Sequence, residues 1–323
     1  MEKESRSSRI NVGYARPIAA ALARPALGLA GLRLALEALR SFFLPQFENA
    51  LFRRRAVVSV DHPLDERVPF DPSRVGTYLE FVKLWIGSLY YLLKRSGPSD
   101  IGAFVDYADA IRDLYADAGS VYRRVHTTTD RPSGDDGLRF ALIRTVDPHL
   151  NCVPSLHVLI VVSNWKIALA TAERIGQGRE LALWVERLRL EAVAITESVL
   201  FVKQHSLNCV GVSLYYLRRR FPRLSEEEVK VFVADLFATE AGRGPLSPET
   251  ARELRQAILA VYRSLDDAYL ARPEAGWRAP ILEFIREAGL RGERAKAVKT
   301  GFNVSLRHCC TDTDSGEERH GLS

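Results

Sequence analysis

The stretch TYLEFVKLWIGSLYYLLK at residues 77–94, followed closely by IGAFVDYADAIRDLYADAGSVY at residues 101–122, decides the fold class of this chain. In the first stretch apolar side chains recur at helical spacing from Leu79 to Leu89. The second stretch is apolar on one side and carries aspartates on the other. Both patterns predict amphipathic helices that bury one face.

C-terminal to these stretches, we expect two further helices over residues 155–175 and 181–218. Proline, glycine and polar residues cluster elsewhere, which predicts loops at residues 51–75 and 127–137. No alternating pattern of apolar and polar residues is long enough to build a sheet. The sequence therefore predicts an all-α fold, a helical bundle.

The N-terminal part of the chain differs from this middle. Residues 1–60 form a predicted amphipathic helical segment, in which Arg33, Glu37 and Arg40 share one face and leave a broad apolar surface. This surface fits either a helix that packs on the core or a basic amphipathic helix that lies on a membrane.

The C-terminal part follows a predicted core over residues 61–220. A C-terminal helical extension is expected over residues 221–300, and a capping box at residues 225–228 opens one of its helices. Residues 301–323 are polar and are predicted to form a disordered tail.

The composition and the net charge limit the classes of protein to which this chain could belong. The 323 residues have 47% hydrophobic and 26% charged side chains, as in ordinary globular proteins, so extensive disorder is excluded. The net charge of +5 is mild and comes with 37 arginines and 8 lysines. It gives no reason to expect a nucleic-acid partner. The surplus of arginine fits codon bias, so a single arginine in a motif is weak evidence.

The chain has four cysteines: Cys152, Cys209, Cys309 and Cys310. They are too few and too irregularly spaced for a disulfide framework, which fits a reducing compartment. Arginines interrupt the apolar stretch within residues 1–45, so no secretory signal is recognised. The longest uncharged run, residues 148–165, contains prolines and polar residues, unlike the roughly 20 apolar residues of a spanning helix. We expect a cytoplasmic or membrane-associated protein, with peripheral membrane contact as one option.

Three segments hold the residues that could carry chemistry. The first has two arginines seven residues apart, Arg124 and Arg131, in and before a predicted loop. The second is PSLH at residues 154–157, at a predicted helix start. The third runs from Ser198 to His205 inside a predicted helix.

These residue types suit phosphoryl transfer. A transferring phosphoryl group spreads negative charge over its oxygens, which guanidinium groups match with two hydrogen bonds each. Donors at a helix N-terminus add to this. One neutral imidazole can attack phosphorus, and a second can protonate the departing alkoxide.

In this order, the segments resemble the signature of the type 2 phosphatidic acid phosphatase superfamily, which runs K-x6-R-P, then P-S-x-H, then S-R-x5-H-x3-D. The chain has Arg124-x6-Arg131-Pro132, PSLH at 154–157 and Ser198-x6-His205. It looks closest to the branch with inositolphosphotransferase-like and sphingolipid-synthase-like members, in which the middle motif is often P-S-L-H. The resemblance covers about residues 60–218. It implies a phosphatidic-acid-phosphatase-like core with the C-terminal helices appended.

What the resemblance implies is a phosphatase or phosphotransferase acting on a phosphomonoester or lipid-linked phosphate through a phosphohistidine. His205 would be the nucleophile and His157 the general acid. Three residues would hold the phosphoryl oxygens: Arg124, Arg131 and Ser155. Neither a metal nor another cofactor is implied, and the partner would be the phosphate ester or phospholipid substrate.

Besides Arg124, which is a cation in place of the signature's lysine, two positions depart from the signature. Val199 stands where the signature has arginine, and Cys209 stands where it has aspartate. On one continuous helix Cys209 would lie one turn from His205, where the family's aspartate orients the histidine. A neutral thiol is a poor substitute for that carboxylate. Either another acid takes its place or the activity is weak or lost; the candidates are Asp147, Glu197 and Asp130.

Two other interpretations stay open. One is a non-catalytic protein that binds phosphate or a lipid headgroup on a degenerate form of this scaffold. The other is a zinc site, because Cys152-x4-His157 and His205-x3-Cys209 could supply two cysteines and two histidines. Lys203 is expected to be solvated or to snorkel toward solvent rather than to contact a ligand. Three histidines are expected in surface or loop positions: His62, His126 and His149.

Overall fold

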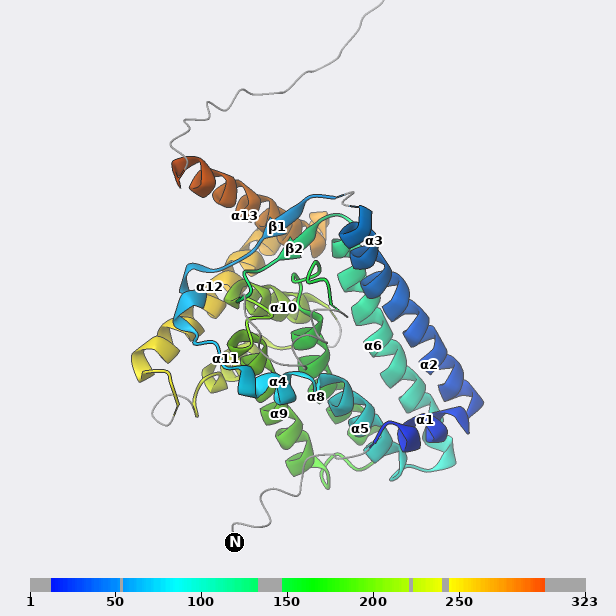
Figure 1. Cartoon of the computed structure of the whole chain (residues 1–323). Helices are drawn as coiled ribbons and strands as arrows, with labels where there is room; N and C mark the ends of the chain where they lie inside the picture. The colour runs from blue at the N-terminus through cyan, green and yellow to red at the C-terminus, as the bar shows by residue number, and fades with distance from the viewer. Residues whose placement is uncertain (1–12, 53–54, 133–146, 221–222, 240–243, 300–323) are drawn as a thin grey trace, which may run out of the picture.

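The computed structural model describes residues 13–52, 55–132, 147–220, 223–239 and 244–299 (Figure 1). Helices dominate these residues, which confirms the all-α fold class. The α-helices are α1 (Ala15–Leu22), α2 (Pro25–Ala38), α3 (Leu44–Phe52), α4 (Val75–Tyr78), α5 (Phe81–Leu93), α6 (Ile101–Tyr122), α8 (Leu156–Arg174), α9 (Ala182–Phe201), α10 (Leu207–Arg219), α11 (Glu226–Asp235), α12 (Pro248–Ala271) and α13 (Arg278–Lys299).

Short elements complete the description. A π-helical segment, Leu39–Phe43, joins α2 to α3 without a break. Short 3-10 helices lie at Pro63–Arg67, Pro72–Arg74, Pro98–Asp100 and Pro273–Ala275. Two strands, β1 (Val57–Ser59) and β2 (His126–Thr128), pair in parallel with Val57 opposite His126. Both strands fall largely in the predicted loops, and three residues are too few to produce an alternating pattern.

Helix α8 lies at the centre of the fold. Its residues 158–162 are all fully buried, as expected of a helix that is apolar all round. Helices α5, α6, α9 and α10 pack around it (Figure 1). The predicted helix over residues 155–175 is thus confirmed, and Ser155 caps its N-terminus by accepting a hydrogen bond from the Val158 amide.

The prediction of one helix over residues 181–218 is wrong, because α9 and α10 are separated by a turn at residues 202–206. Lys203 adopts a φ of 55°, in the left-handed region, which a continuous helix does not contain. Ser206 then caps α10 by accepting hydrogen bonds from the amides of Asn208 and Cys209. The helix expected at residues 77–94 is likewise divided, into α4 and α5.

The two ends of the chain share the core of the middle part. One cluster of buried apolar side chains extends from Leu27 in α2 to Ala288 in α13. Helix α2 packs on α6, and α12 packs on α10. The capping box at residues 225–228 is confirmed at the start of α11. The predicted tail at 301–323 and residues 133–137 of the predicted loop at 127–137 lie outside the described residues, and the domain boundaries stay predictions.

Candidate functional site

The segment that leads into α8 is held beside β2. The Thr127 amide donates to the Leu150 carbonyl over 3.0 Å, and the Cys152 amide donates to the Thr127 carbonyl over 3.2 Å. The Thr127 hydroxyl accepts a further bond from the Val153 amide at 2.9 Å. This pairing brings the end of the arginine motif next to the PSLH motif.

The two predicted catalytic histidines lie together. His157 is in the first turn of α8, and His205 is in the turn between α9 and α10. The His205 Nε2 atom is 3.4 Å from the His157 Nδ1 atom, and the ring centroids are 5.5 Å apart. The fold therefore joins two motifs that are 48 residues apart.

A third histidine completes the cluster. His149, predicted to lie at the surface or in a loop, is buried, with its ring centroid 6.4 Å from that of His205. Its Nε2 atom lies 2.8 Å from the Thr129 hydroxyl and 3.5 Å from the Cys152 sulfur. The one sequence signal for its burial is its place within the uncharged run at 148–165.

Arg131 lies at the edge of the cluster. Its guanidinium donates to the side-chain carbonyl of Gln204, the residue before His205. It is also 3.8 Å from the Asp147 carboxylate, which accepts a hydrogen bond from the His149 amide at 2.9 Å. Arg131 thus reaches the site, together with Asp147, one of the three acids considered as replacements.

Burial keeps the three imidazoles neutral. It lowers the pKa of His157 from its ordinary value to about 3. Burial, together with Arg131 and His157, lowers the pKa of His149 and His205 well below the ordinary value. For Asp147 burial raises the pKa. The rings of Tyr78 and Phe81 pack on His157 with centroids 4.5 and 4.2 Å away.

Two of the predicted phosphate ligands make other contacts. Arg124 is exposed at the end of α6, where its guanidinium donates to the Ser120 carbonyl. Ser155 is fully buried; its hydroxyl serves as the cap of α8, and its amide donates to Ser213. Neither residue lines the cavity at the histidines.

Cys209 also lies elsewhere than the sequence suggested. Because the chain turns at residues 202–206, Cys209 is in the first turn of α10 rather than one helical turn beyond His205. Its sulfur is 3.6 Å from the Ser206 hydroxyl. Of the other two acids, Glu197 accepts from the Phe237 amide, and the amide of exposed Asp130 donates to Asp61.

Two further predictions about single residues need correction, those for His126 and Lys203. His126 is fully buried, with Nδ1 3.1 Å from the Leu150 carbonyl and 3.0 Å from the Asn151 side-chain oxygen. Lys203 is not simply solvated, since its ammonium donates to the Asp65 carbonyl. For zinc, the described residues contain no group of three or more His, Cys, Asp or Glu arranged to hold a metal ion.

The histidine cluster encloses very little space. The cavity lined by His149, His157 and His205 has about 10 Å³, room for about one water molecule. It adjoins an apolar cavity of about 360 Å³ that is lined mainly by aromatic and aliphatic side chains. The two cavities share four lining residues: Phe42, Asp147, Leu156 and His157. The histidines thus sit at the end of an aromatic cavity.

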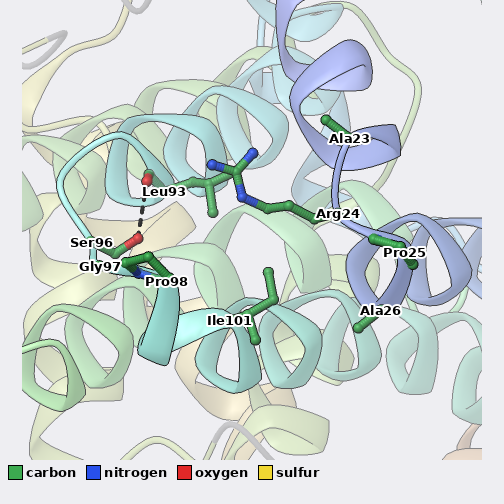
Figure 2. Close-up of a pocket in the computed structure, with 9 residues that line it drawn as sticks. All are labelled: Ala23, Arg24, Pro25, Ala26, Leu93, Ser96, Gly97, Pro98 and Ile101. Atoms are coloured by element: carbon green, nitrogen blue, oxygen red, sulfur yellow. Dashed lines mark hydrogen bonds between the residues drawn. The ribbon is translucent and has the colours of Figure 1, made fainter.

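Another cavity, of about 420 Å³, lies away from the histidines, where the α1–α2 corner meets the loop between α5 and α6 (Figure 2). Figure 2 shows the Arg24 side chain reaching across this corner toward Leu93. No predicted site residue lines this cavity.

One described helix, α8, is long and apolar enough to cross a bilayer, but 78% of its most apolar window is buried inside the fold, so it is weak evidence for a membrane span. Comparison with protein-family models, with curated proteins and with solved structures finds no match to this chain.

Proposed function

We propose that the protein is a phosphatase or phosphotransferase that acts on a phosphomonoester through a phosphohistidine at His205. The observation that supports this is the 3.4 Å contact between the ring nitrogens of His205 and His157, two residues that the motif order singled out. Arg131 lies next to His205, since its guanidinium is hydrogen-bonded to the side chain of Gln204, the preceding residue. A nucleophile, an acid and a guanidinium are the groups that this chemistry needs.

The substrate has to part the two rings. A separation of 3.4 Å is a hydrogen-bond contact, and a cavity of about 10 Å³ does not hold a phosphoryl group. The adjoining cavity of about 360 Å³ opens beside His157 and gives room for the leaving group. Arg131 would turn from Gln204 to the phosphoryl oxygens.

The proton that the leaving group needs comes from the substrate. His157 is neutral in the free protein, so the proton enters with the phosphomonoester monoanion, whose charge raises the pKa of His157. The His205 nitrogen bonds to phosphorus, the phosphorus–oxygen bond breaks, and His157 gives its proton to the alkoxide. Water, or a second alcohol in a transferase, then attacks phosphorus and returns a proton to His157 as the phosphorus–nitrogen bond breaks.

Replacement of His205 tests the proposal. We expect His205→Asn to lower hydrolysis of 4-nitrophenyl phosphate and of phosphatidic acid by about 100-fold or more, because no nucleophile remains. Wild type that is mixed with substrate and then quenched in base should carry a phosphoryl group on His205, which acid then releases. The variant should carry none. The matched control is His62→Asn, a half-buried histidine that caps the 3-10 helix Pro63–Arg67 and lies outside the cluster. Equal activity in His205→Asn and His62→Asn would refute a phosphohistidine.

Replacement of His157 separates the acid from the nucleophile. A nitrophenolate needs little protonation to depart, whereas an alkoxide needs a proton. We therefore expect His157→Asn to slow hydrolysis of an alkyl phosphate by about 10-fold more than that of 4-nitrophenyl phosphate. Equal losses on the two substrates would contradict the role of His157 as the general acid.

A non-catalytic phosphate-binding protein is the second candidate, and one observation favours it. The Nδ1 atom of His205 makes no well-formed hydrogen bond within the described part of the chain, so no carboxylate of a described residue orients the ring through that atom. Phosphate or vanadate would stabilise such a protein against thermal unfolding. The protein would hydrolyse neither 4-nitrophenyl phosphate nor phosphatidic acid. Loss of that stabilisation in Arg131→Gln would identify the same cavity as the binding site.

A further inference from the structure

The outward face of the N-terminal helices is unusually apolar. Of the 18 large hydrophobic side chains that are exposed among the described residues, 11 lie between Tyr14 and Phe52. Six of them follow one line along α2 and α3 and are 37–57% exposed. We call these six the leucine stripe: Leu29, Leu32, Leu36, Leu39, Leu44 and Phe47.

The π-helical segment keeps this stripe on one face. Its members are spaced by three or four residues, as in an α-helix, except between Leu39 and Leu44. That wider step coincides with the segment Leu39–Phe43, whose turn is wider than an α-helical turn by about one residue. The stripe is therefore continuous across α2, the π-helical segment and α3.

The opposite face of the same helix is fixed to the core. Leu27, Ala30 and Leu34 of α2 are buried where α2 packs on α6. Gly119 of α6 lies so close that an added Cβ would come 2.5 Å from the Ser41 side chain. Figure 1 shows α2 and α3, in blue, at the edge of the molecule with α6 on their inner side. The stripe is thus presented on a rigid support.

The charges around the stripe are mostly positive. Between residues 13 and 48 the exposed charged side chains are four arginines and one glutamate: Arg16, Arg24, Arg33, Arg40 and Glu48. Arg33 and Arg40 each follow a stripe leucine directly and so flank it on the same side, and Glu48 follows Phe47 at the end of the stripe. The other acidic residue in this range, Glu37, is half-buried and accepts a hydrogen bond from Ser41.

We propose that the leucine stripe docks on an anionic lipid surface. Leucines would enter the boundary between headgroups and acyl chains, while the arginines bind lipid phosphates. A second copy of the chain is a poorer occupant, because two such faces would bring arginines against arginines. Phe42 and Phe43, from the π-helical segment, line the aromatic cavity that ends at His157, so docking would bring this cavity close to the lipid.

Vesicle co-sedimentation with the full chain tests the docking. We expect wild type to bind vesicles of phosphatidylcholine with about 30% phosphatidylserine, and to bind pure phosphatidylcholine several-fold less. The triple variant Leu29→Gln, Leu32→Gln, Leu36→Gln should bind about 10-fold less. The matched control is Leu183→Gln, Leu190→Gln, Leu270→Gln, three leucines that are 80%, 49% and 60% exposed elsewhere, and it should bind as wild type does. Arg33→Gln with Arg40→Gln should lower binding to the anionic vesicles alone.

Three results would overturn this inference. They are no binding by wild type, an equal loss in the stripe variant and its control, or a dimer in light scattering that only the stripe variant dissociates. Circular dichroism of wild type, the two triple variants and the double arginine variant first shows whether each protein is folded. Because the substituted side chains are exposed, we expect all four to fold. Because His205→Asn should bind vesicles as wild type does, failure of the docking and failure of the proposed chemistry give different results.

Discussion

At the scale of single residues, burial decides what the histidines of the cluster can do. His149, His157 and His205 are all less than a tenth exposed, and burial is the main cause of their lowered pKa values. In the unfolded chain the same imidazoles have a pKa of about 6.5, so unfolding takes up protons below that pH. The contribution of these three histidines to the stability of the folded state is therefore largest above about pH 6.5 and falls as the pH is lowered.

The pH dependence of unfolding tests this. Between about pH 4 and pH 6 the unfolded chain binds a proton at His157 and the folded chain does not, because the folded pKa is about 3. We expect His157→Gln to reduce the slope of the free energy of unfolding against pH by about 1.4 kcal/mol per pH unit. Urea titrations of both proteins at several pH values measure it. An unchanged slope would mean that His157 titrates normally in the folded protein.

Asp65 changes the free energy of unfolding in the opposite direction over part of that pH range. Burial raises its pKa to about 6, so the folded state holds this proton more tightly than the unfolded state. Its contribution rises as the pH falls from about 6 toward 4. Because Asp65 is present in both proteins, the comparison of wild type with His157→Gln cancels its effect.

At the scale of elements, the contact of α10 with α12 depends on the absence of a side chain. A Cβ added to Gly211 in α10 would lie 2.7 Å from the Val261 Cβ and 3.0 Å from the Ile258 carbonyl oxygen of α12. That carbonyl belongs to the main chain of a helix, so it cannot move alone. The two helices would have to separate, and α10 begins directly after the turn that holds His205.

Gly211→Ala is therefore expected to lower the free energy of unfolding by roughly 1–3 kcal/mol, in spite of the better helix propensity of alanine. The matched control is Gly31→Ala in α2, where an added Cβ meets nothing within 4 Å. There we expect a gain of about 0.5–1 kcal/mol. Urea denaturation measures both, and the same sign of change in the two variants would contradict the close approach.

At the scale of the whole molecule, the C-terminal helices complete the core rather than lie on it. The Tyr215 hydroxyl in α10 donates to the Trp277 carbonyl, and the Tyr216 ring packs on the Trp277 ring at 5.0 Å. Buried side chains of α12, including Leu254 and Ile258, belong to the same cluster as those of α8. Removing these helices would expose apolar surface that no remaining element covers.

We expect a chain that ends at residue 220 to lose cooperative unfolding, because its core would be incomplete. A chain that ends at residue 299 is the control and should keep the wild-type midpoint in urea, as the predicted tail implies. Tryptophan fluorescence and circular dichroism, followed together, measure both. A sharp transition near the wild-type midpoint for the shorter chain would instead support residues 61–220 as an independent domain.

Much of the fold follows from local pattern. The helix at 101–122, the start of α8 at Ser155 and the capping box at 225–228 were all predictable, because helical periodicity and caps depend on neighbours in sequence. The turn between α9 and α10 was not, since the strained backbone at Lys203 is held by its bond to the distant Asp65 carbonyl. Strands β1 and β2 were not predicted for a similar reason, because each is defined by its hydrogen bonds to the other.

The helical class, the order of the three motifs and the choice of His157 and His205 as candidates all follow from the amino-acid sequence. Three facts come from the folded structure instead: His149 joins the two histidines, Arg124 and Ser155 do not line their cavity, and Cys209 lies apart from His205. The difference arises because periodicity is a property of neighbouring residues. Burial and side-chain contact depend instead on which distant segments the fold brings together.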